Sequence, residues 1–251
     1  MSQTKKYDKS FIIKKINLEM IMKKYFYNVL LLLKNIKNYG FITVLKIILY
    51  EFFYIVKYRD LASLSHDDKD SDSYENSTNK NMYDTPYIPT PFYFLKIICL
   101  FLKKIKEDDL LILDLGCGYS RVQYFFSSHF KSFFFGVDIN KTIINKLKKK
   151  NIKNSYFLNL NLRKVKDLKL LIKNTKKIKK KKNLLIFFSD SFDVNLLNKV
   201  INSLSREFNF NCILINVKNT TFLSRKYRTL FVKKFKNPER NIKIFKTRPS
   251  C

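Results

Sequence analysis

From residue 110 onward, short apolar runs alternate with segments whose apolar residues recur at helical spacing. Five runs have the length of strands: Leu110–Leu115, Phe133–Val137, Tyr156–Leu160, Leu184–Phe188 and Cys212–Val217. Between them, the pattern predicts helices over residues 119–130, 141–150, 166–180 and 192–206. Because these runs are continuously apolar, both faces of each strand are expected to be covered, which is typical of a parallel sheet with helices on each side.

The end of the chain has a different pattern. Leu230–Phe235 and Ile242–Phe245 flank the turn-forming residues Asn237-Pro238-Glu239-Arg240, which predicts an antiparallel β-hairpin. The chain from residue 86 to 251 is therefore expected to form a Rossmann-like α/β domain. Its sheet should be mainly parallel and seven-stranded, with the antiparallel hairpin at its C-terminal end.

Residues 1–63 form a separate zone, which is predicted to be a helical extension. Lys46 and Glu51 interrupt its longest apolar stretch, Phe41–Val56, which falls short of the about 18 uninterrupted apolar residues that a spanning helix needs. The apolar residues of this stretch cover more than one helical face and must be buried against something. They are expected either to pack on the domain or a partner, or to place residues 11–60 in a membrane interface with lysines toward lipid headgroups.

Residues 64–85 are acidic and polar with almost no apolar side chain, which predicts a flexible linker. The helix that follows is expected to run to about Lys106. Thr90 can cap its start, and Pro91 suits the first helical position because it lacks an N–H group.

The formal net charge of +30 is typical of nucleic-acid-binding proteins, but its distribution is not. The lysines are spread over the whole chain, arginine is a small share of the basic residues, and the densest run, residues 176–182, is typical of a solvated helix end. A nucleic-acid partner is therefore not favoured. The four cysteines are widely spaced, which predicts no metal site and fits a reducing cytoplasm, or the inner face of a membrane if the extension binds lipid.

Glycine is scarce, and three of the four glycines lie within 21 residues: Gly116, Gly118 and Gly136. The first two follow Asp114 at the end of a predicted strand, where the backbone must turn sharply toward a helix. Asp138 ends the next strand, 24 residues after Asp114, where its carboxylate can accept both hydroxyl groups of a ribose.

Two classes of nucleotide ligand use this layout. A dinucleotide requires G-x-G-x-x-G, but Arg121 occupies the third glycine position, where its bulk should block close helix–strand packing. S-adenosylmethionine requires an acid two residues before the first glycine, and Asp114 supplies it. Asp114 would hold the amino group of the ligand directly or through water, and the amides of the loop would receive its carboxylate.

The stretch Asp-Leu-Gly-Cys-Gly-Tyr-Ser-Arg, followed by Phe-Gly-Val-Asp-Ile-Asn, resembles the first two motifs of class I S-adenosylmethionine-dependent methyltransferases. With the upstream Tyr-Ile-Pro-Thr, it resembles a narrower group. That group includes bacterial methyltransferases of unassigned substrate and membrane-associated lysine methyltransferases that modify the ATP synthase rotor subunit. The resemblance covers residues 86–217 by sequence and the hairpin by position, and it implies the class I methyltransferase fold.

The resemblance also implies a set of cofactor-binding residues. Asp114, Gly116, Cys117, Gly118 and Tyr119 would cradle the methionine end, whereas Asp138 and Ile139 would bind the ribose side. Asn161 stands where the family has an adenine-contacting acid, with Asn159 as the alternative. Tyr87 and Thr90 would close over the cofactor, and Ser189 follows the fourth strand. Ser120 replaces a frequent third glycine, a small change if its φ is negative.

The chemistry implied is transfer of a methyl group to a nitrogen or oxygen nucleophile of an unidentified acceptor. Asp190 could take a proton from that nucleophile, or cap the helix predicted over 192–206. The Asn/Asp-Pro-Pro-aromatic motif of amino-group methyltransferases is absent after the fourth strand, which argues against chemistry on adenine or glutamine nitrogen. A catalytically inactive, methyltransferase-like binding module and a membrane-surface scaffold are the alternatives.

Overall fold

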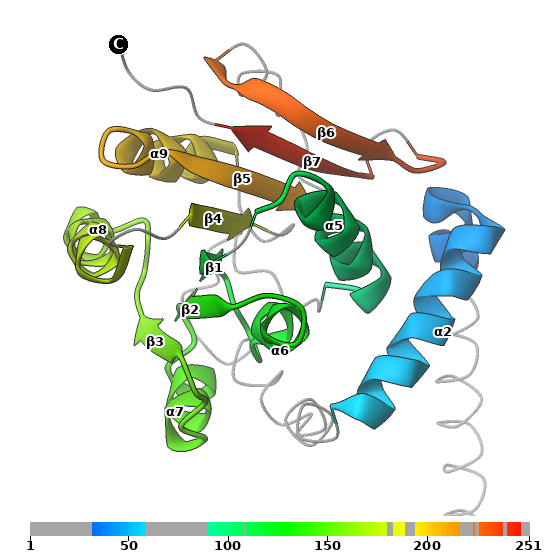
Figure 1. Ribbon diagram of the computed structural model, residues 1–251, viewed down its shortest axis with the longest axis horizontal. Helices are drawn as coiled ribbons and strands as arrows, with labels where there is room; N and C mark the ends of the chain where they lie inside the picture. The colour runs from blue at the N-terminus through cyan, green and yellow to red at the C-terminus, as the bar shows by residue number, and fades with distance from the viewer. Residues whose placement is uncertain are drawn as a thin grey trace, which may run out of the picture.

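The computed structural model describes residues 32–58, 90–107, 109–179, 183–188, 194–215, 223, 226–237 and 240–246. The described residues build one seven-stranded sheet flanked by helices (Figure 1). Its strands are β1 (Leu110–Leu115), β2 (Ser132–Asp138), β3 (Ser155–Asn159), β4 (Asn183–Phe188), β5 (Phe210–Ile215), β6 (Arg228–Lys234) and β7 (Asn241–Lys246).

The strand order is β3-β2-β1-β4-β5-β7-β6. Strands β1 to β5 are parallel to their neighbours, β7 runs antiparallel to β5, and β6 runs antiparallel to β7. Arg240 N donates to Asn237 O (2.9 Å) in the turn between the last two strands. The mainly parallel seven-stranded sheet with a C-terminal antiparallel hairpin is thus confirmed, and this is the α/β architecture that the resemblance to class I methyltransferases implies.

Helices cover both faces of the sheet. The helices are α5 (Phe92–Lys104), α6 (Arg121–Ser127), α7 (Lys141–Lys149), α8 (Val165–Lys179) and α9 (Val194–Ser205). On β1, Leu110 and Ile112 pack toward α5, α6 and α7, whereas Leu111, Leu113 and Leu115 pack toward α8 and α9. Since side chains alternate along a strand, Asp114 projects to the α5–α6 side, like Ile112.

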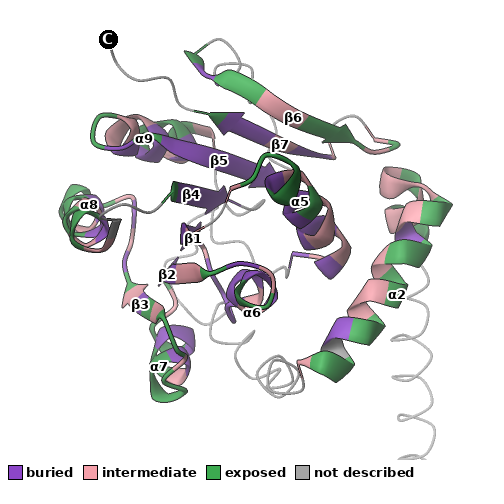
Figure 2. Cartoon of the chain, in the orientation of Figure 1, coloured by how far each residue is buried: buried purple, intermediate pink, exposed green. Residues whose placement is uncertain are grey.

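Helix α2 (Phe41–Lys57) packs outside α5 (Figure 1). The Tyr54 ring stacks on Phe92 at 5.0 Å between centroids, and Val44 and Tyr54 are buried. The expected packing on the domain is therefore observed for one face of α2, while its other face is exposed (Figure 2). No helix in the described part of the chain is long and apolar enough to cross a bilayer.

The start of α5 differs from the expectation. Pro91 is the N-cap residue, one position later than expected, and no side-chain hydrogen bond is made at this cap position. Instead, Glu51 of α2 accepts a hydrogen bond from Phe92 N through its Oε1 atom (2.8 Å). The expected capping role of Thr90 was therefore wrong, because a residue 41 positions away in the sequence supplies the acceptor.

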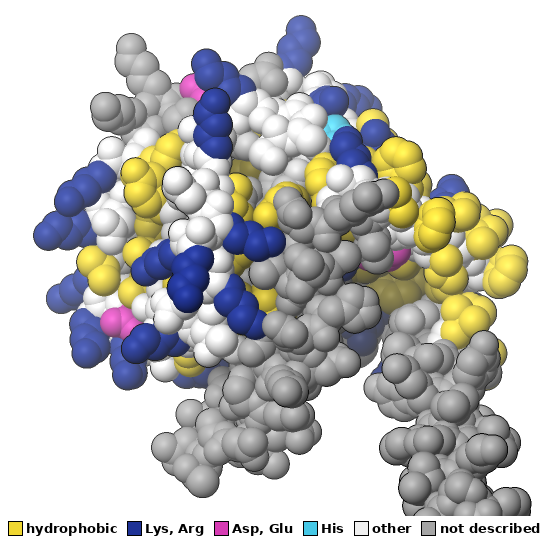
Figure 3. All heavy atoms as spheres, turned by 90° about the horizontal axis from the view of Figure 1, so that it is seen from below, with side chains coloured by type: hydrophobic (Ala, Val, Ile, Leu, Met, Phe, Trp, Pro, Cys, Tyr) yellow, Lys and Arg dark blue, Asp and Glu magenta, His cyan; other side chains and the backbone are white. Residues whose placement is uncertain are grey.

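Lysine and arginine side chains are distributed around the face seen in Figure 3, whereas apolar side chains gather on the right-hand side, where α2 lies. The dispersion of the basic residues agrees with their even spacing in the sequence.

Candidate functional site

The turn between β1 and α6 is held by backbone hydrogen bonds to β2. Gly116 and Gly118 have φ angles of 85° and 46°, in the left-handed region that favours glycine. The N–H groups of Gly116 and Cys117 both donate to Val137 O, at 2.8 and 3.0 Å. The chain therefore folds back over the carboxyl end of β2 instead of continuing along the sheet.

Asp138 lies directly against this turn. Its Oδ2 atom accepts from Gly118 N (2.9 Å), and its Oδ1 atom accepts from Asn140 N (2.8 Å). Its side chain is almost buried, and burial raises the pKa of its carboxyl, although the hydrogen bonds from Asn140, Gly118 and Ile139 oppose that rise. The two elements that the sequence predicts to meet, the glycine turn and the acid of the second strand, are in contact.

Asp114 is buried on β1, between the neighbouring strands β2 and β4. It pairs in register with Gly136 of β2 and Phe187 of β4, and only 4% of it is exposed. No residue in the described part of the chain donates a hydrogen bond to its carboxylate or forms an ion pair with it. Burial, followed by repulsion from Asp138, raises the pKa of Asp114 to about 8. The carboxyl end of β1 therefore holds a buried acid that is mostly neutral at pH 7.

The space around the turn is filled closely. An added Cβ at Gly136 would lie 2.8 Å from Phe157 Cδ1 and 3.0 Å from Cys117 Sγ. Cys117 and Tyr119 are buried, and burial raises the pKa of the Cys117 thiol well above its usual value. Gly136 thus allows β2, β3 and the turn to approach one another, and the Cys117 thiol stays protonated.

The backbone amides of the turn are engaged within the protein. Besides Gly116, Cys117 and Gly118, the N–H of Ser120 donates to Cys117 O (2.8 Å). The amides of this loop were expected to face the carboxylate of a ligand, and in this structure those of Gly116, Cys117 and Gly118 bond to protein oxygens instead. Ser120 has a φ angle of 67°, so the negative φ under which serine would be a small change from glycine is not found, and the residue is strained.

Beyond Asp138, the carboxyl ends of β2 and β3 are joined by one side chain. Asn159 Nδ2 donates to Asp138 O (3.1 Å) and to Ile139 O (2.7 Å). Asn161 faces its own turn, where its Oδ1 accepts from Arg163 N (3.0 Å). Ile139 is 44% exposed and leaves an apolar surface beside Asp138.

A salt bridge that the sequence does not reveal connects this edge to α2. Arg121, the first residue of α6, pairs with Glu51 through Nη1 and Oε2 at 2.6 Å, and its guanidinium lies 4.5 Å above the Phe92 ring. Arg121 Nη1 also lies 3.4 Å from Thr90 O, so Thr90, a buried residue, contacts the helix that follows the turn. The only sequence signal for this salt bridge was a single acid within an apolar helix, and Glu51 was interpreted as an interruption of the apolar stretch.

Three predicted site residues, Tyr87, Ser189 and Asp190, lie outside the described residues, as do the predicted linker 64–85 and most of the N-terminal extension. Among the described residues, no group of histidine, cysteine or acidic side chains could hold a metal ion.

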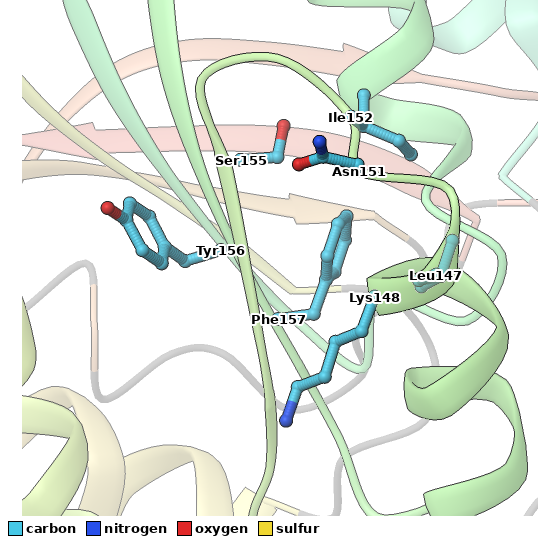
Figure 4. A pocket seen from close by; sticks show the side chains of 7 residues that line it. All are labelled: Leu147, Lys148, Asn151, Ile152, Ser155, Tyr156 and Phe157. Atoms are coloured by element: carbon cyan, nitrogen blue, oxygen red, sulfur yellow. The ribbon is translucent and has the colours of Figure 1, made fainter.

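A small cavity of about 140 Å³ lies at the opposite end of β3 (Figure 4). It is lined by the end of α7 and the start of β3, including Leu147, Ile152 and Ser155. Phe157 points toward Leu147 and Ile152, whereas Tyr156 points to the other side of the strand. Because parallel sheets bind ligands at the carboxyl ends of their strands, this cavity is separate from the candidate site.

Comparisons with known proteins identify neither a matching family model nor a curated protein with a matching sequence. Among solved structures, the chain is similar to an RNA methyltransferase from Salinibacter ruber in complex with S-adenosyl-L-homocysteine (12% identity, TM-score 0.45, covering 65% of this chain and 96% of that chain). It is also similar to magnesium protoporphyrin IX methyltransferase from Synechocystis PCC 6803 with bound SAM (12% identity, TM-score 0.44, covering 69% of this chain and 92% of that chain). A third similar structure is the N-methyltransferase NodS from Bradyrhizobium japonicum WM9 in complex with S-adenosyl-L-homocysteine (11% identity, TM-score 0.44, covering 71% of this chain and 97% of that chain). Since each is at most 12% identical, the residues of this chain have to carry the functional conclusion.

Proposed function

We propose that this chain binds S-adenosylmethionine at the carboxyl ends of β1 and β2 and transfers its methyl group to a nitrogen or oxygen nucleophile. The observation that carries the proposal is the pair of buried acids at the glycine turn. Asp114 has no donor among the described residues, and Asp138 lies against Gly118 on the adjacent strand. In a chain with a net charge of +30, two acids buried together mark a place for a cation.

The chemistry of the cofactor fits this pair. Its amino-acid end carries an ammonium group near neutral pH, and that group could donate to the Asp114 carboxylate, which then ionises. The carboxylate of the cofactor needs donors other than the amides of Gly116, Cys117 and Gly118, or a local change in the turn, because those amides are already bonded.

The nucleoside end fits the neighbouring surface. A carboxylate has about four lone-pair sites, and the backbone bonds from Gly118, Asn140 and Ile139 leave acceptor capacity on Asp138 for a ribose hydroxyl. Ile139, exposed beside it, offers an apolar surface on which an adenine ring can pack. Asn159 keeps these two strand ends together, which supports a positioning role for it, while Asn161 stays the candidate for adenine contact.

The bound cofactor supplies an electrophilic methyl group. A lone pair of the acceptor forms the new bond to the methyl carbon, the carbon–sulfur bond breaks with its electrons left on sulfur, and the acceptor's proton passes to a base. Such a displacement depends mainly on alignment, so a rigid turn between β1 and β2 is a suitable platform. Asp190, which follows β4, is our candidate for the base.

Calorimetric titration of the purified full chain with S-adenosylmethionine tests the binding site. Asp114→Asn removes the charged acceptor, which should weaken binding about tenfold to hundredfold. Asp138→Asn should also weaken binding, whereas the matched control Glu207→Gln, on the far surface, should leave it unchanged. Equal affinity in the wild type and the Asp114 variant, or no binding by the wild type, would contradict the site.

Transfer itself needs a second readout. The wild type and the Asp190→Asn variant would be incubated with methyl-labelled cofactor and separated membrane, soluble-protein and small-molecule fractions of a cell. Label appearing in one fraction with the wild type identifies the acceptor class. Cofactor binding without label transfer to any fraction would instead support the catalytically inactive binding module.

A further inference from the structure

The outward face of α2 carries a continuous apolar stripe. Eight of its side chains are more than 40% exposed: Phe41, Ile42, Leu45, Ile48, Leu49, Phe52, Phe53 and Val56. Their spacing of three and four residues places them along one side of the helix. The most exposed are Phe52 at 73% and Ile42 at 69%. A patch of this length is rarely left in water, which indicates a partner surface.

The inward face of the same helix is already occupied. Val44 and Tyr54 are buried, and Glu51 bonds to both Phe92 N and the Arg121 guanidinium. Helix α2 is therefore fixed on the domain by one side and cannot turn its apolar stripe inward without breaking these contacts.

The charges around the stripe all have one sign. Lys46 and Lys57 are exposed, and because they are eleven residues apart, about three helical turns, they lie on the same border of the stripe. Lys34 and Lys37 are exposed on the preceding helical turns. Glu51 is the single acidic residue between positions 32 and 58, and it faces the domain. The exposed charged side chains of α2 are thus all lysines, and they lie along one border of the stripe.

A groove adjoins the stripe. It has a volume of about 290 Å³ between α2 and α5 and is lined by Leu49, Tyr50, Phe53, Tyr54 and Lys96. An apolar groove with an ammonium group at its edge is complementary to a hydrocarbon chain that ends in an anionic group.

We propose that α2 lies in the interface of an anionic lipid bilayer, with its axis parallel to the membrane plane. The apolar stripe enters the boundary between headgroups and acyl chains, and Lys46, Lys57 and Lys96 contact lipid phosphates. The combination of one apolar face, a lysine border and no exposed acid on α2 favours lipid over a protein partner. The α2 helix has 17 residues and lies flat against α5, so it binds on the surface of the bilayer and does not cross it. The proposal is independent of methyl transfer, since none of these residues belongs to the cofactor site.

Co-sedimentation of the full chain with lipid vesicles tests the proposal. One set of vesicles is pure phosphatidylcholine, and the other is an equal mixture of phosphatidylcholine and phosphatidylglycerol. We expect the wild type to sediment with the mixed vesicles and to be released as salt is raised, because screening weakens its attraction to the anionic lipid. The double variant Ile42→Asp/Phe52→Asp should bind them at least about tenfold more weakly, since two large apolar groups would no longer enter the bilayer.

The matched control is Val165→Asp, which places an acid at another exposed apolar position, the 58% exposed first residue of α8. It should sediment like the wild type. Both changed residues of the double variant are solvent-exposed, so its melting temperature should match that of the wild type. If it melts early, the milder Phe52→Ser replaces it.

Three outcomes would overturn the proposal. The first is equal vesicle binding by the double variant and the wild type, and the second is no binding by the wild type. The third is a wild-type dimer that the double variant converts to monomer without any vesicle binding, which would make a second copy of this chain the occupant of the stripe.

Discussion

At the carboxyl ends of β1 and β2 two carboxylates are buried away from water, whereas on α2 eight apolar side chains are exposed to it. Each arrangement is unfavourable for the protein alone. A buried carboxylate loses its favourable hydration, and an exposed apolar side chain stays in unfavourable contact with water. Asp138 accepts from Gly118 N and Asn140 N, so Asp114 is the acid that lacks a donor among the described residues. The partners we propose have opposite chemistry: a cation that donates a hydrogen bond to Asp114, and a lipid surface for the apolar stripe. Both proposals thus start from a local environment that is unfavourable in the protein alone.

Glu51 is an acid of the same molecule whose carboxylate has hydrogen-bond and ion-pair partners. It is partly buried, with 24% of its side chain exposed against 4% of Asp114, and it accepts from Phe92 N and pairs with Arg121. Its position on α2 also connects the two regions, since Arg121 begins the helix that follows the glycine turn. Neutralising Asp114 and neutralising Glu51 should therefore have opposite effects on stability.

The largest expected effect is the pH dependence caused by Asp114. Its pKa is about 8 in the folded protein and about 4 in the unfolded chain, so the folded state holds the proton more tightly. The stability due to this proton is fully present below about pH 4 and is lost as pH rises toward 8. In the absence of ligand, Asp114→Asn should be more stable than the wild type at pH 8.5 by several kcal/mol, because a difference of one in pKa corresponds to about 1.4 kcal/mol.

Thermal or urea unfolding at pH 5 and pH 8.5 measures this difference. The advantage of the Asn variant should shrink strongly at pH 5, where Asp114 keeps its proton in the folded protein. A constant difference at both pH values would mean that Asp114 does not titrate in this range.

Close packing around the acids can be tested at Gly136. Gly136→Ala should destabilise the fold by about 1–3 kcal/mol, because its methyl group would lie 2.8 Å from Phe157 Cδ1 and 3.0 Å from Phe134 Cε1. Urea unfolding measures the change. An unaltered free energy of unfolding would show that the Phe157 and Phe134 rings move aside and that the packing around Gly136 is loose.

Glu51→Gln sharpens the contrast between the two kinds of acid. The variant keeps an acceptor for Phe92 N but weakens the pair with Arg121, so we expect a loss of about 1–2 kcal/mol at any pH between 6 and 8.5. The exposed pair of Lys176 and Glu207 provides the control, and Glu207→Gln should change stability by less than about 0.5 kcal/mol. A gain in stability from Glu51→Gln would remove the distinction between satisfied and unsatisfied acids.

The smallest effect concerns Ser120. Its φ of 67° strains any residue with a Cβ, and its Oγ donates to Gln123 Oε1 at 2.8 Å. Ser120→Ala loses the hydrogen bond and keeps the strain, whereas Ser120→Gly loses both, so the Gly variant should be more stable than the Ala variant by about 1 kcal/mol. The reverse order in chemical denaturation would contradict the left-handed conformation.

Much of the fold follows from local patterns in the sequence. Strand β1 has the predicted bounds, and the other strands begin and end within two residues of their predicted ends, because continuous apolar runs identify covered strands. The contact between Asp138 and the glycine turn was also predictable, since both lie at the carboxyl ends of adjacent parallel strands.

The errors lie where distant residues decide the outcome. The α5 start is capped by Glu51, and that contact joins segments 41 residues apart, so no local capping signal encodes it. Helix α6 begins at Arg121 and not at residue 119, because Ser120 is left-handed. Likewise, the amides of Gly116 and Cys117 bond to Val137 O, an acceptor that only the pairing of β1 with β2 brings near.

The central claim, that Asp114 receives the ammonium group of S-adenosylmethionine, is tested most directly by counting protons during binding. At pH 6.5 Asp114 is protonated in the free protein, and ionisation beside a bound ammonium group would release close to one proton. Calorimetric titration in buffers of different ionisation enthalpy measures that number. We predict release of about one proton for the wild type and almost none for Asp114→Asn; the same proton count in both would contradict the assignment.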